Sequence, residues 1–284
     1  MRDAALKSLA VGFFDGVHLG HQAILKGSDA ALTFSNHPLS VLAPEKAPRL
    51  IMSVEERIAA IKDCGVRDVT VLDFTPELAE MSAEEFADSF LKRKGFRFSA
   101  VRCGANWRFG AGGTGDAAFL RSRGIAVEVA PYVEYRGERI SSSRIRACLE
   151  RGEIEDANSM MGRRFKVQGL KFKGKGLGAD IGYPTLNLKL ETLNLKLPLG
   201  VYEVEVDGLK GIANYGLAPT LGDRAWARPV MEVHLLGKGT KDMGRQTSDG
   251  VSVTLVRHVR PERKFASIDD LKRQIAADCA TIAT

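Results

Sequence analysis

The chain has 284 residues, 44% hydrophobic and 27% charged, which is typical of a soluble globular protein with material for one large or two ordinary domains. Its net charge of +6 is spread along the sequence, and no block of like charges indicates a nucleic-acid-binding tail. The first residues lack a signal-peptide pattern, and no stretch approaches the roughly 20 uninterrupted apolar residues that span a bilayer, so we expect a cytoplasmic protein without nucleic-acid or membrane partners.

The first half of the chain alternates apolar runs with helical patterns. The capping-box pairs Ser53/Glu56 and Ser82/Glu85 each predict the start of a helix. A third helix is predicted over 116–123, and strands are predicted at 8–14, 30–35, 69–74, 98–104 and 125–131. Strands separated by such helices indicate an α/β, Rossmann-like domain with a parallel sheet, which binds ligands at the carboxyl ends of its strands.

Beyond residue 161 the pattern changes to alternating strands with dense glycine between them, at 201–206, 231–236 and 251–257. This indicates a small antiparallel β-barrel, since closure removes exposed sheet edges. One last helix is predicted over 268–282. We therefore predict two domains, 1–161 and 162–284.

The segment from Gly12 to His21 follows the first strand and opens a helix. Its glycines allow a ligand to approach the backbone closely, and the helix N-terminus offers unpaired N–H groups to an anion. His18 and His21 lie three residues apart, so both can face one triphosphate and stabilise charge developing on it. A zinc site would need further ligands, and His37 is the one other histidine in this domain.

The run of serines at 141–143 predicts a second anion-facing helix start. Ser142 and Ser143 can cap the helix or turn their hydroxyls to a phosphate. Arg146 follows one turn after Ser143 and can reach the same anion in a bidentate way. On its own, this pattern is more often an ordinary helix cap. In a chain that also has the paired histidines, it favours phosphate binding.

A glycine-rich segment opens the second domain. The amides of Gly174, Gly176 and Gly178 can wrap phosphates, although the Walker ending is missing and a plain surface loop would have the same composition. Thr185 and Asn187 lie two apart in an extended segment, so they point to one side and offer hard oxygen ligands suited to Mg²⁺.

These motifs together resemble those of a known family. The segment Gly12 to His21 resembles the GxFDGVHxGH signature of bacterial FAD synthetases, the bifunctional riboflavin kinase/FMN adenylyltransferases. Segments 33–38, 104–110 and 141–146 resemble the family's TFxPHP, GxNFRFG and SSTRIR motifs, with Asn36 in place of a proline and Trp107 in place of a phenylalanine. Residues 184–187 resemble the PTxN motif of riboflavin kinases, and 200–202, 213–216, 231–236 and 260–265 follow the same pattern.

The resemblance implies that the chain phosphorylates riboflavin to FMN and adenylylates FMN to FAD, with ATP as co-substrate and Mg²⁺ as cofactor. It implies Glu232 as the catalytic base of the kinase, and His18, His21 and Arg146 as catalytic groups of adenylyl transfer. Flavin binding is expected at His37 and Asn106, and metal binding at Thr185 and Asn187. The residues expected to bind ATP are Gly12, Phe13, Asp15, His18, His21, Ser142, Ser143, Arg146, Gly174, Gly176 and Gly178.

The chain also departs from the family pattern. The first helix of the N-terminal domain must be short, because few residues separate His21 from Thr33. Ala179, Ala218 and Gly237 replace polar or charged residues of the kinase half. They motivate the alternative of an FMN adenylyltransferase with a degenerate, flavin-binding kinase domain. A non-catalytic flavin-binding protein is a third reading, and the sequence leaves the oligomeric state open.

Overall fold

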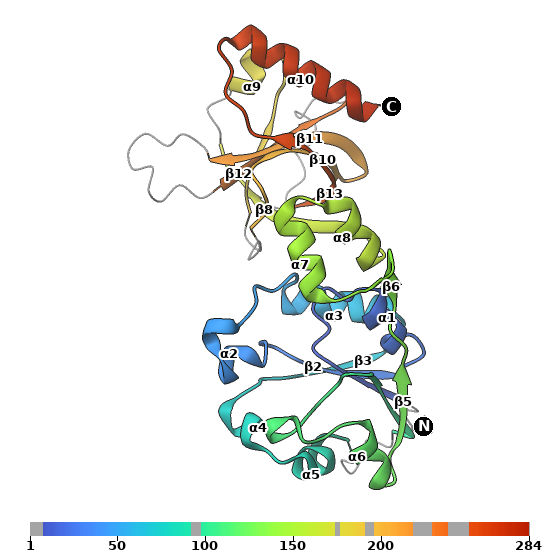
Figure 1. Ribbon diagram of the computed structural model, residues 1–284. Helices are drawn as coiled ribbons and strands as arrows, with labels where there is room; N and C mark the ends of the chain where they lie inside the picture. The colour runs from blue at the N-terminus through green and yellow to red at the C-terminus, as the bar shows by residue number, and fades with distance from the viewer. Residues whose placement is uncertain are drawn as a thin grey trace, which may run out of the picture. The chain divides into compact units, whose positions relative to one another are not determined.

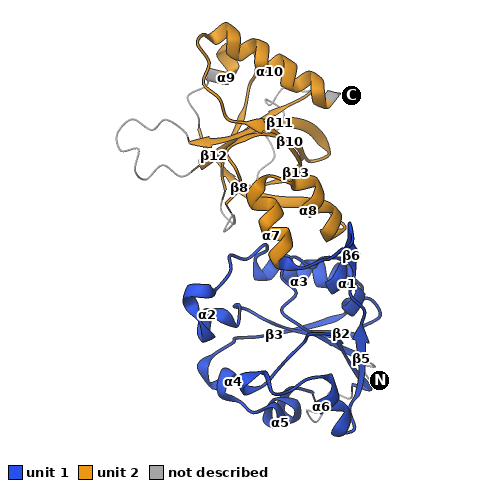
Figure 2. Ribbon diagram, viewed as in Figure 1, with its two compact units in different colours: residues 1–142 blue, residues 143–284 orange. Residues whose placement is uncertain are grey.

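The computed structural model describes residues 8–91, 98–173, 177–190, 196–217, 229–237 and 250–283. The chain divides into two compact units, residues 1–142 and 143–284 (Figure 2). Two helices, α7 (Ser142–Arg151) and α8 (Ile154–Met161), thus group almost entirely with the second unit, whereas the sequence analysis placed them in the first domain. The Asn158 side chain explains this grouping for α8, because it donates to the Leu255 carbonyl and accepts from the Phe165 amide of the barrel.

The first unit is built on a parallel sheet of five strands in the order β3-β2-β1-β4-β5, which confirms the predicted Rossmann-like class (Figure 1). Its strands are β1 (Ser8–Val11), β2 (Ala30–Phe34), β3 (Asp68–Leu72), β4 (Ala100–Gly104) and β5 (Ala126–Ala130). Because all five run in the same direction, the loops after β1, β2 and β4, which carry the predicted site residues, leave the sheet at one edge.

Helices cover both faces of this sheet (Figure 1). One core joins β1 and β2 to α4 (Pro76–Glu80), α5 (Ala83–Phe86) and α6 (Ala117–Ser122). The opposite core joins the sheet to α1 (Leu19–Leu25) and α3 (Val54–Asp63). The predicted capping boxes form at the starts of α3 and α5, where each serine accepts from the glutamate amide and each glutamate accepts from the serine amide. A short α2 (Leu39–Leu42) and the hairpin β6 (Glu134–Tyr135) and β7 (Glu138–Arg139) complete the unit.

Helix α1 has seven residues, as short as the sequence predicts. Arg102 of β4 lies beside its end, where it donates to the Lys26 carbonyl and forms an ion pair of 2.9 Å with Glu128 of β5. The short helix therefore ends beside this ion pair.

The second unit is a closed antiparallel barrel in the order β10-β11-β12-β9-β8-β13, which confirms the predicted barrel. Its strands are β8 (Phe165–Lys171), β9 (Leu186–Leu190), β10 (Gly200–Val206), β11 (Leu209–Leu217), β12 (Pro229–Leu235) and β13 (Gly250–Pro261). A short helix, α9 (Leu177–Asp180), precedes β9, and the predicted last helix is α10 (Ile268–Ala283). It packs on the outer face of the barrel through Ile282 against Val201 and Ile212. Asp278 of α10 is buried and accepts three hydrogen bonds of 2.7–3.1 Å from Arg260.

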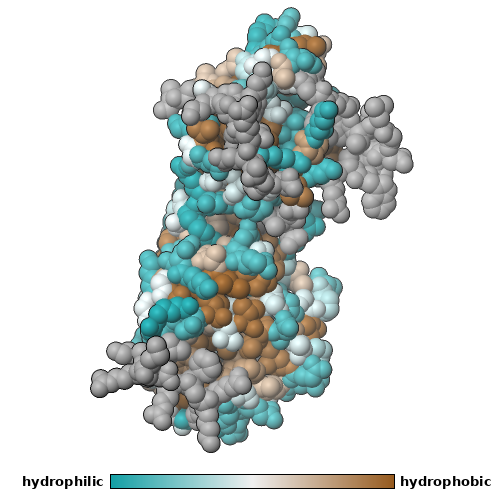
Figure 3. Space-filling view, turned by 180° about the vertical axis from the view of Figure 1, so that it is seen from behind, coloured by the Kyte–Doolittle hydropathy of each residue, from teal (hydrophilic) through white to brown (hydrophobic). Residues whose placement is uncertain are grey.

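The surface differs between the two units on the face seen from behind, where hydrophobic residues gather over part of the first unit and hydrophilic ones predominate on the second (Figure 3). None of the helices in the described ranges has the length and apolarity to cross a membrane.

Candidate active sites

The loop between β1 and α1 has an unusual backbone. Phe14 and Val17 adopt positive φ angles of 57° and 36°, and Gly16 adopts 81°. Non-glycine residues in this region cost about 1–3 kcal/mol each and gather at ligand-binding sites. Gly20, in the first turn of α1, has no room for a side chain without crowding, because a Cβ there would lie 3.2 Å from the His18 ring. The loop is thus folded tightly around the first turn of the helix.

His18 and His21 are brought together as the sequence predicts. Their rings stack with centroids 3.6 Å apart, and His18 is buried with 5% of its surface exposed. The His18 Nδ1 caps α1 by accepting from the His21 amide at 3.2 Å. An acceptor Nδ1 requires the neutral ring to carry its proton on Nε2. Nε2 is therefore the His18 nitrogen that can donate to a phosphate.

Asp15 is also buried, and its contacts show it holding the loop. Its carboxylate accepts from the Ile51 amide at 3.0 Å and the Met52 amide at 3.3 Å. Its carbonyl accepts from the Ser142 hydroxyl at 2.8 Å. Ser142, the first residue of α7, is thereby tied to the loop that carries the histidines. By binding these two amides, the carboxylate holds the shape of the loop that is expected to bind ATP.

Ser143 and Arg146 follow Ser142 in α7, within the second unit. The contribution of these two residues to the phosphate site is a prediction.

The loop after β2 brings His37 to the same edge of the sheet. Its ring lies edge-on to Phe13 with centroids 4.8 Å apart, and its Nδ1 accepts from the Leu39 amide at 3.1 Å. Asn36 binds both backbone groups of Phe74 with its amide, donating at 3.0 Å and accepting at 2.8 Å. The residue that replaces the expected proline therefore joins the ends of β2 and β3.

Gly12 and Asn106 complete the predicted set of this unit. A Cβ at Gly12 would lie 2.9 Å from the Phe14 ring, so the absence of a side chain lets that ring fold back beside β1. Asn106 follows β4 and is exposed. Its carboxyl-edge position fits a substrate contact.

In the barrel, Glu232 of β12 lies directly opposite Asn187 of β9 and, on its other side, Asn214 of β11. Opposed residues of an antiparallel pair share one face of the sheet, with Cβ atoms about 5 Å apart. Met231, Val233 and Leu188 are buried on the inside, so the row Asn187–Glu232–Asn214 faces outward. The sequence identified Asn187 and Glu232 but not Asn214.

Glu232 is exposed along this row, yet the barrel wall beneath it raises the pKa of its carboxyl through desolvation. A carboxylate with a raised pKa is a stronger base than an ordinary surface glutamate.

Thr185 precedes β9 by one residue and is held from two sides. The His234 Nδ1 lies 2.9 Å from the Pro184 carbonyl, and its ring meets Tyr183 edge-on at 5.3 Å. Gly178 of α9 lies against the same segment, since a Cβ there would collide with the Tyr183 carbonyl and come within 3.2 Å of the Thr185 hydroxyl. Gly174 and Gly176 lie outside the described residues.

The donor set of the barrel suits Mg²⁺. Asn187 lies on the side that Glu232 occupies, Thr185 precedes Asn187 by two residues, and all three side chains offer hard oxygen atoms. Within the described ranges, no group of three or more His, Cys, Asp or Glu side chains is arranged to hold a metal ion. A metal here would need phosphate oxygens as further ligands, as in kinases.

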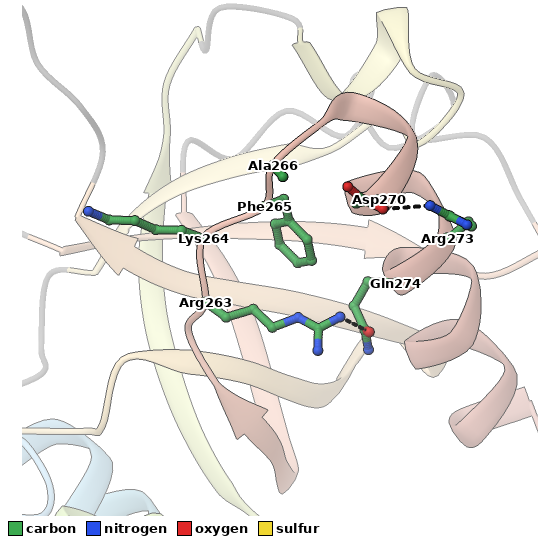
Figure 4. A pocket seen from close by; sticks show the side chains of 7 residues that line it. All are labelled: Arg263, Lys264, Phe265, Ala266, Asp270, Arg273 and Gln274. Atoms are coloured by element: carbon green, nitrogen blue, oxygen red, sulfur yellow. Dashed lines mark hydrogen bonds and ion pairs between the residues drawn. The ribbon is translucent and has the colours of Figure 1, made fainter.

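A pocket that the sequence analysis missed opens where β13 leads into α10 (Figure 4). It is lined by Arg263, Lys264, Phe265, Ala266, Asp270, Arg273 and Gln274. Glu262, just before it, reaches back over β11, where a Cβ at Gly216 would lie 2.6 Å from its Oε1 and 3.2 Å from the Asn214 amide nitrogen. Glu262, which precedes the pocket in the chain, therefore lies against β11, the strand next to Glu232.

Both halves of the chain are similar to known protein families. A family model described as FAD synthetase matches residues 2–144, and one described as riboflavin kinase matches residues 161–284. The bifunctional riboflavin kinase/FMN adenylyltransferase of Escherichia coli K12 is 35% identical and covers 95% of this chain and 90% of its own length. The protein of the same description from Bacillus subtilis is 31% identical, over 97% and 91%.

A solved structure has the same fold. The crystal structure of a protein described as a macrolide-efflux protein from Streptococcus pneumoniae superposes with a TM-score of 0.86 at 25% identity, covering 100% of this chain and 96% of the other. The likeness is one of fold.

Proposed function

Because the chain belongs to the family of bifunctional riboflavin kinase/FMN adenylyltransferases, it is a transferase that makes FMN and FAD, and we propose that its two reactions run in separate sites. One site lies at the carboxyl edge of the parallel sheet, and the other on the outer face of the barrel. The presence of both domains disfavours the reading of an adenylyltransferase with a degenerate kinase half. We also propose that residues 1–161 and 162–284 form the two domains and that the protein is located in the cytoplasm.

In the first site, a phosphate oxygen of FMN attacks the α-phosphorus of ATP, and the bond to the departing pyrophosphate breaks. The attacking group is already an anion, so no protein base is required. His18 and His21 donate to the ATP phosphates, aided by Ser142, Ser143 and Arg146, and positioning supplies much of the rate. Gly12, Phe13 and Asp15 shape the loop that receives ATP. His37 and Asn106 seat the flavin nucleotide from the neighbouring loops.

In the second site, the riboflavin 5′-oxygen forms a bond to the γ-phosphorus of ATP, the bond to the β,γ-bridging oxygen breaks, and ADP leaves. Glu232 accepts the proton of the attacking hydroxyl. Thr185 and Asn187 would hold Mg²⁺, which neutralises charge on the phosphates when bound. Gly174, Gly176 and Gly178 would enclose the phosphates. The observation that carries this assignment is the register that places Asn187 opposite Glu232.

The test compares wild-type protein with Glu232→Ala. Each is incubated with ATP and Mg²⁺ and either riboflavin or FMN, and the flavins are separated by chromatography. We expect Glu232→Ala to abolish FMN formation and to leave FMN-to-FAD conversion intact. Glu205→Ala is the matched control, because Glu205 is another barrel glutamate but is paired with Arg164 at 2.5 Å.

Each alternative has its own outcome. FAD formed by the wild type only when FMN is supplied would indicate a degenerate kinase, and no conversion at all would indicate a flavin-binding protein. Loss of both activities in a folded Glu232→Ala protein would contradict separate sites.

A further inference from the structure

Arg57, in the second turn of α3, is fully buried, with 0% of its surface exposed. Arginine is almost never fully buried unless its charge is paired. Yet Arg57 forms no ion pair with any residue in the described part of the chain. Desolvation lowers the pKa of its guanidinium, and the charge of Asp15 opposes that shift. A buried cation of this kind calls for an explanation beyond packing.

Its contacts are all with the loops at the carboxyl edge of the sheet. The Nη2 atom donates to the Phe34 carbonyl at 2.5 Å and reaches the Ser35 carbonyl at 3.5 Å. The guanidinium lies over the Phe13 ring, 4.3 Å from its centroid. Phe13 follows β1, whereas Phe34 ends β2 and Ser35 follows it. One side chain from α3 therefore joins the ends of two neighbouring strands where the adenylyl site is built.

Phe13 in turn contacts a residue that is expected to bind substrate. Its ring meets the edge of His37, and its carbonyl accepts from the Thr33 hydroxyl at 2.9 Å. Two residues further on, Asp15 is held by the amides of Ile51 and Met52, which lead into the same helix α3. The loop that carries His18 and His21 is thus fixed to α3 at two points, Asp15 and Phe13.

The Arg57 Nε and Nη1 atoms are buried and have no hydrogen-bond partner among the described residues. Leaving a buried donor unsatisfied costs about 1–3 kcal/mol. A methionine would fill similar space without that cost. Because this arginine lowers stability, we explain its presence by the groups that its planar guanidinium holds in place.

We propose that Arg57 is a positioning residue for adenylyl transfer, and that its guanidinium, by joining Phe13 to the end of β2, fixes the loop of His18 and His21 relative to His37. This inference rests on the proposed function of that loop. Arg57 is too deeply buried to touch substrate, so it acts through Phe13 and the backbone of Phe34.

The experiment compares Arg57→Met and Arg57→Lys in the full-length protein, with Arg67→Met as the matched control. Arg67 is an exposed arginine of the same unit, paired with Asp29 at 2.6 Å. For each variant we measure kcat and KM for ATP and for FMN in FAD formation, riboflavin phosphorylation in the same preparation, and the midpoint of thermal unfolding. Because the kinase site lies in the barrel, its rate reports how much of the second unit is folded, and the thermal unfolding reports the state of the first unit, which holds Arg57.

We expect Arg57→Met to lower kcat of FAD formation roughly 100-fold, the order of loss that follows a misplacement of about 1 Å. Riboflavin phosphorylation should stay at the wild-type rate. Arg57→Lys keeps the charge but loses the fork, so it should recover only part of the lost rate. Phe13→Leu should lower the same kcat, and adding Arg57→Met to it should cause little further loss, since both changes break one contact.

Unchanged kcat and KM in a folded Arg57→Met protein would overturn the proposal. So would equal losses in both reactions, or a lower unfolding midpoint with normal kcat per folded molecule, because these are the results of a purely structural role. If Arg57→Met does not fold, a Phe13→Leu variant with wild-type kcat would overturn it instead. Failure of the proposed function itself is distinct, because wild-type protein would then form no FAD from FMN.

Discussion

Asn187 of β9 and Glu232 of β12 lie directly opposite each other, so the amide of one and the carboxylate of the other are neighbours on the outer face of the barrel. The two residues are 45 positions apart in the sequence, and only the antiparallel pairing of their strands brings them together. Their proposed roles, metal ligand and base, require this proximity.

The first prediction concerns Asn187. Replacing it with alanine removes one oxygen ligand, so riboflavin phosphorylation should need at least roughly tenfold more Mg²⁺ for half-maximal rate. The measurement is a Mg²⁺ titration of both reactions. The titration of FAD formation is the internal control and should not move. An unchanged requirement for the kinase would remove Asn187 from the metal site.

The second prediction concerns pH. Desolvation raises the pKa of Glu232 above its ordinary value of 4.5. The group accepts a proton only when ionised, so the kinase rate should fall as pH decreases through that raised pKa, and the fall should begin at a higher pH than an ordinary glutamate would give. Rates are measured at low riboflavin concentration, with FAD formation from FMN as reference. A profile that stays flat down to pH 4.5 would contradict the role of Glu232 as base.

The third prediction separates two roles of His18. Asparagine is a good N-cap residue, so His18→Asn should keep α1 capped and leave the unfolding midpoint nearly unchanged. It removes Nε2, however, and FAD formation should fall roughly 100-fold, as for the loss of one hydrogen-bond donor to a developing charge. Single-turnover kinetics with FMN and ATP give the rate. Near-normal turnover would indicate that His18 is only a cap.

The fourth prediction concerns stability. Asp278 is 5% exposed at its side chain and is held by Arg260, so Asp278→Ala leaves a nearly buried guanidinium unpaired. Breaking such a pair costs about 3–5 kcal/mol. Glu205→Ala, which breaks a pair with more exposed partners, should cost less than about 1 kcal/mol. Urea unfolding followed by circular dichroism measures both, and equal costs would contradict the prediction.

Much of this fold could be predicted from local patterns. The capping boxes at Ser53 and Ser82 mark the starts of α3 and α5, and the strands of the parallel sheet fall within a few residues of their apolar runs. The last helix was also expected almost to the residue. These elements are determined by neighbours in the sequence, which is why pattern alone suffices.

The site was only partly predictable, because its remaining residues depend on pairing across strands. Asn214 reaches Glu232 through the β11–β12 register, and His234 reaches Pro184 across 50 residues. Arg57 did leave a signal, since it lies at helical spacing from Val54 and Ile61 on the face that α3 buries. A charged residue on the apolar face of a helix is a sequence signal for a buried group of this kind.

The brevity of α1 has a consequence for how this fold can vary. An anion meets only the amides of a helix's opening turn, whereas the area that a helix packs on a sheet grows with every turn. Anion binding by the first turn and packing of the helix on the sheet can therefore change independently of each other. Here the chain keeps the opening turn, capped by His18, and the short helix ends beside the ion pair of Arg102 and Glu128. Anion binding therefore fixes the residue at which this helix starts, but it does not fix the length of the helix.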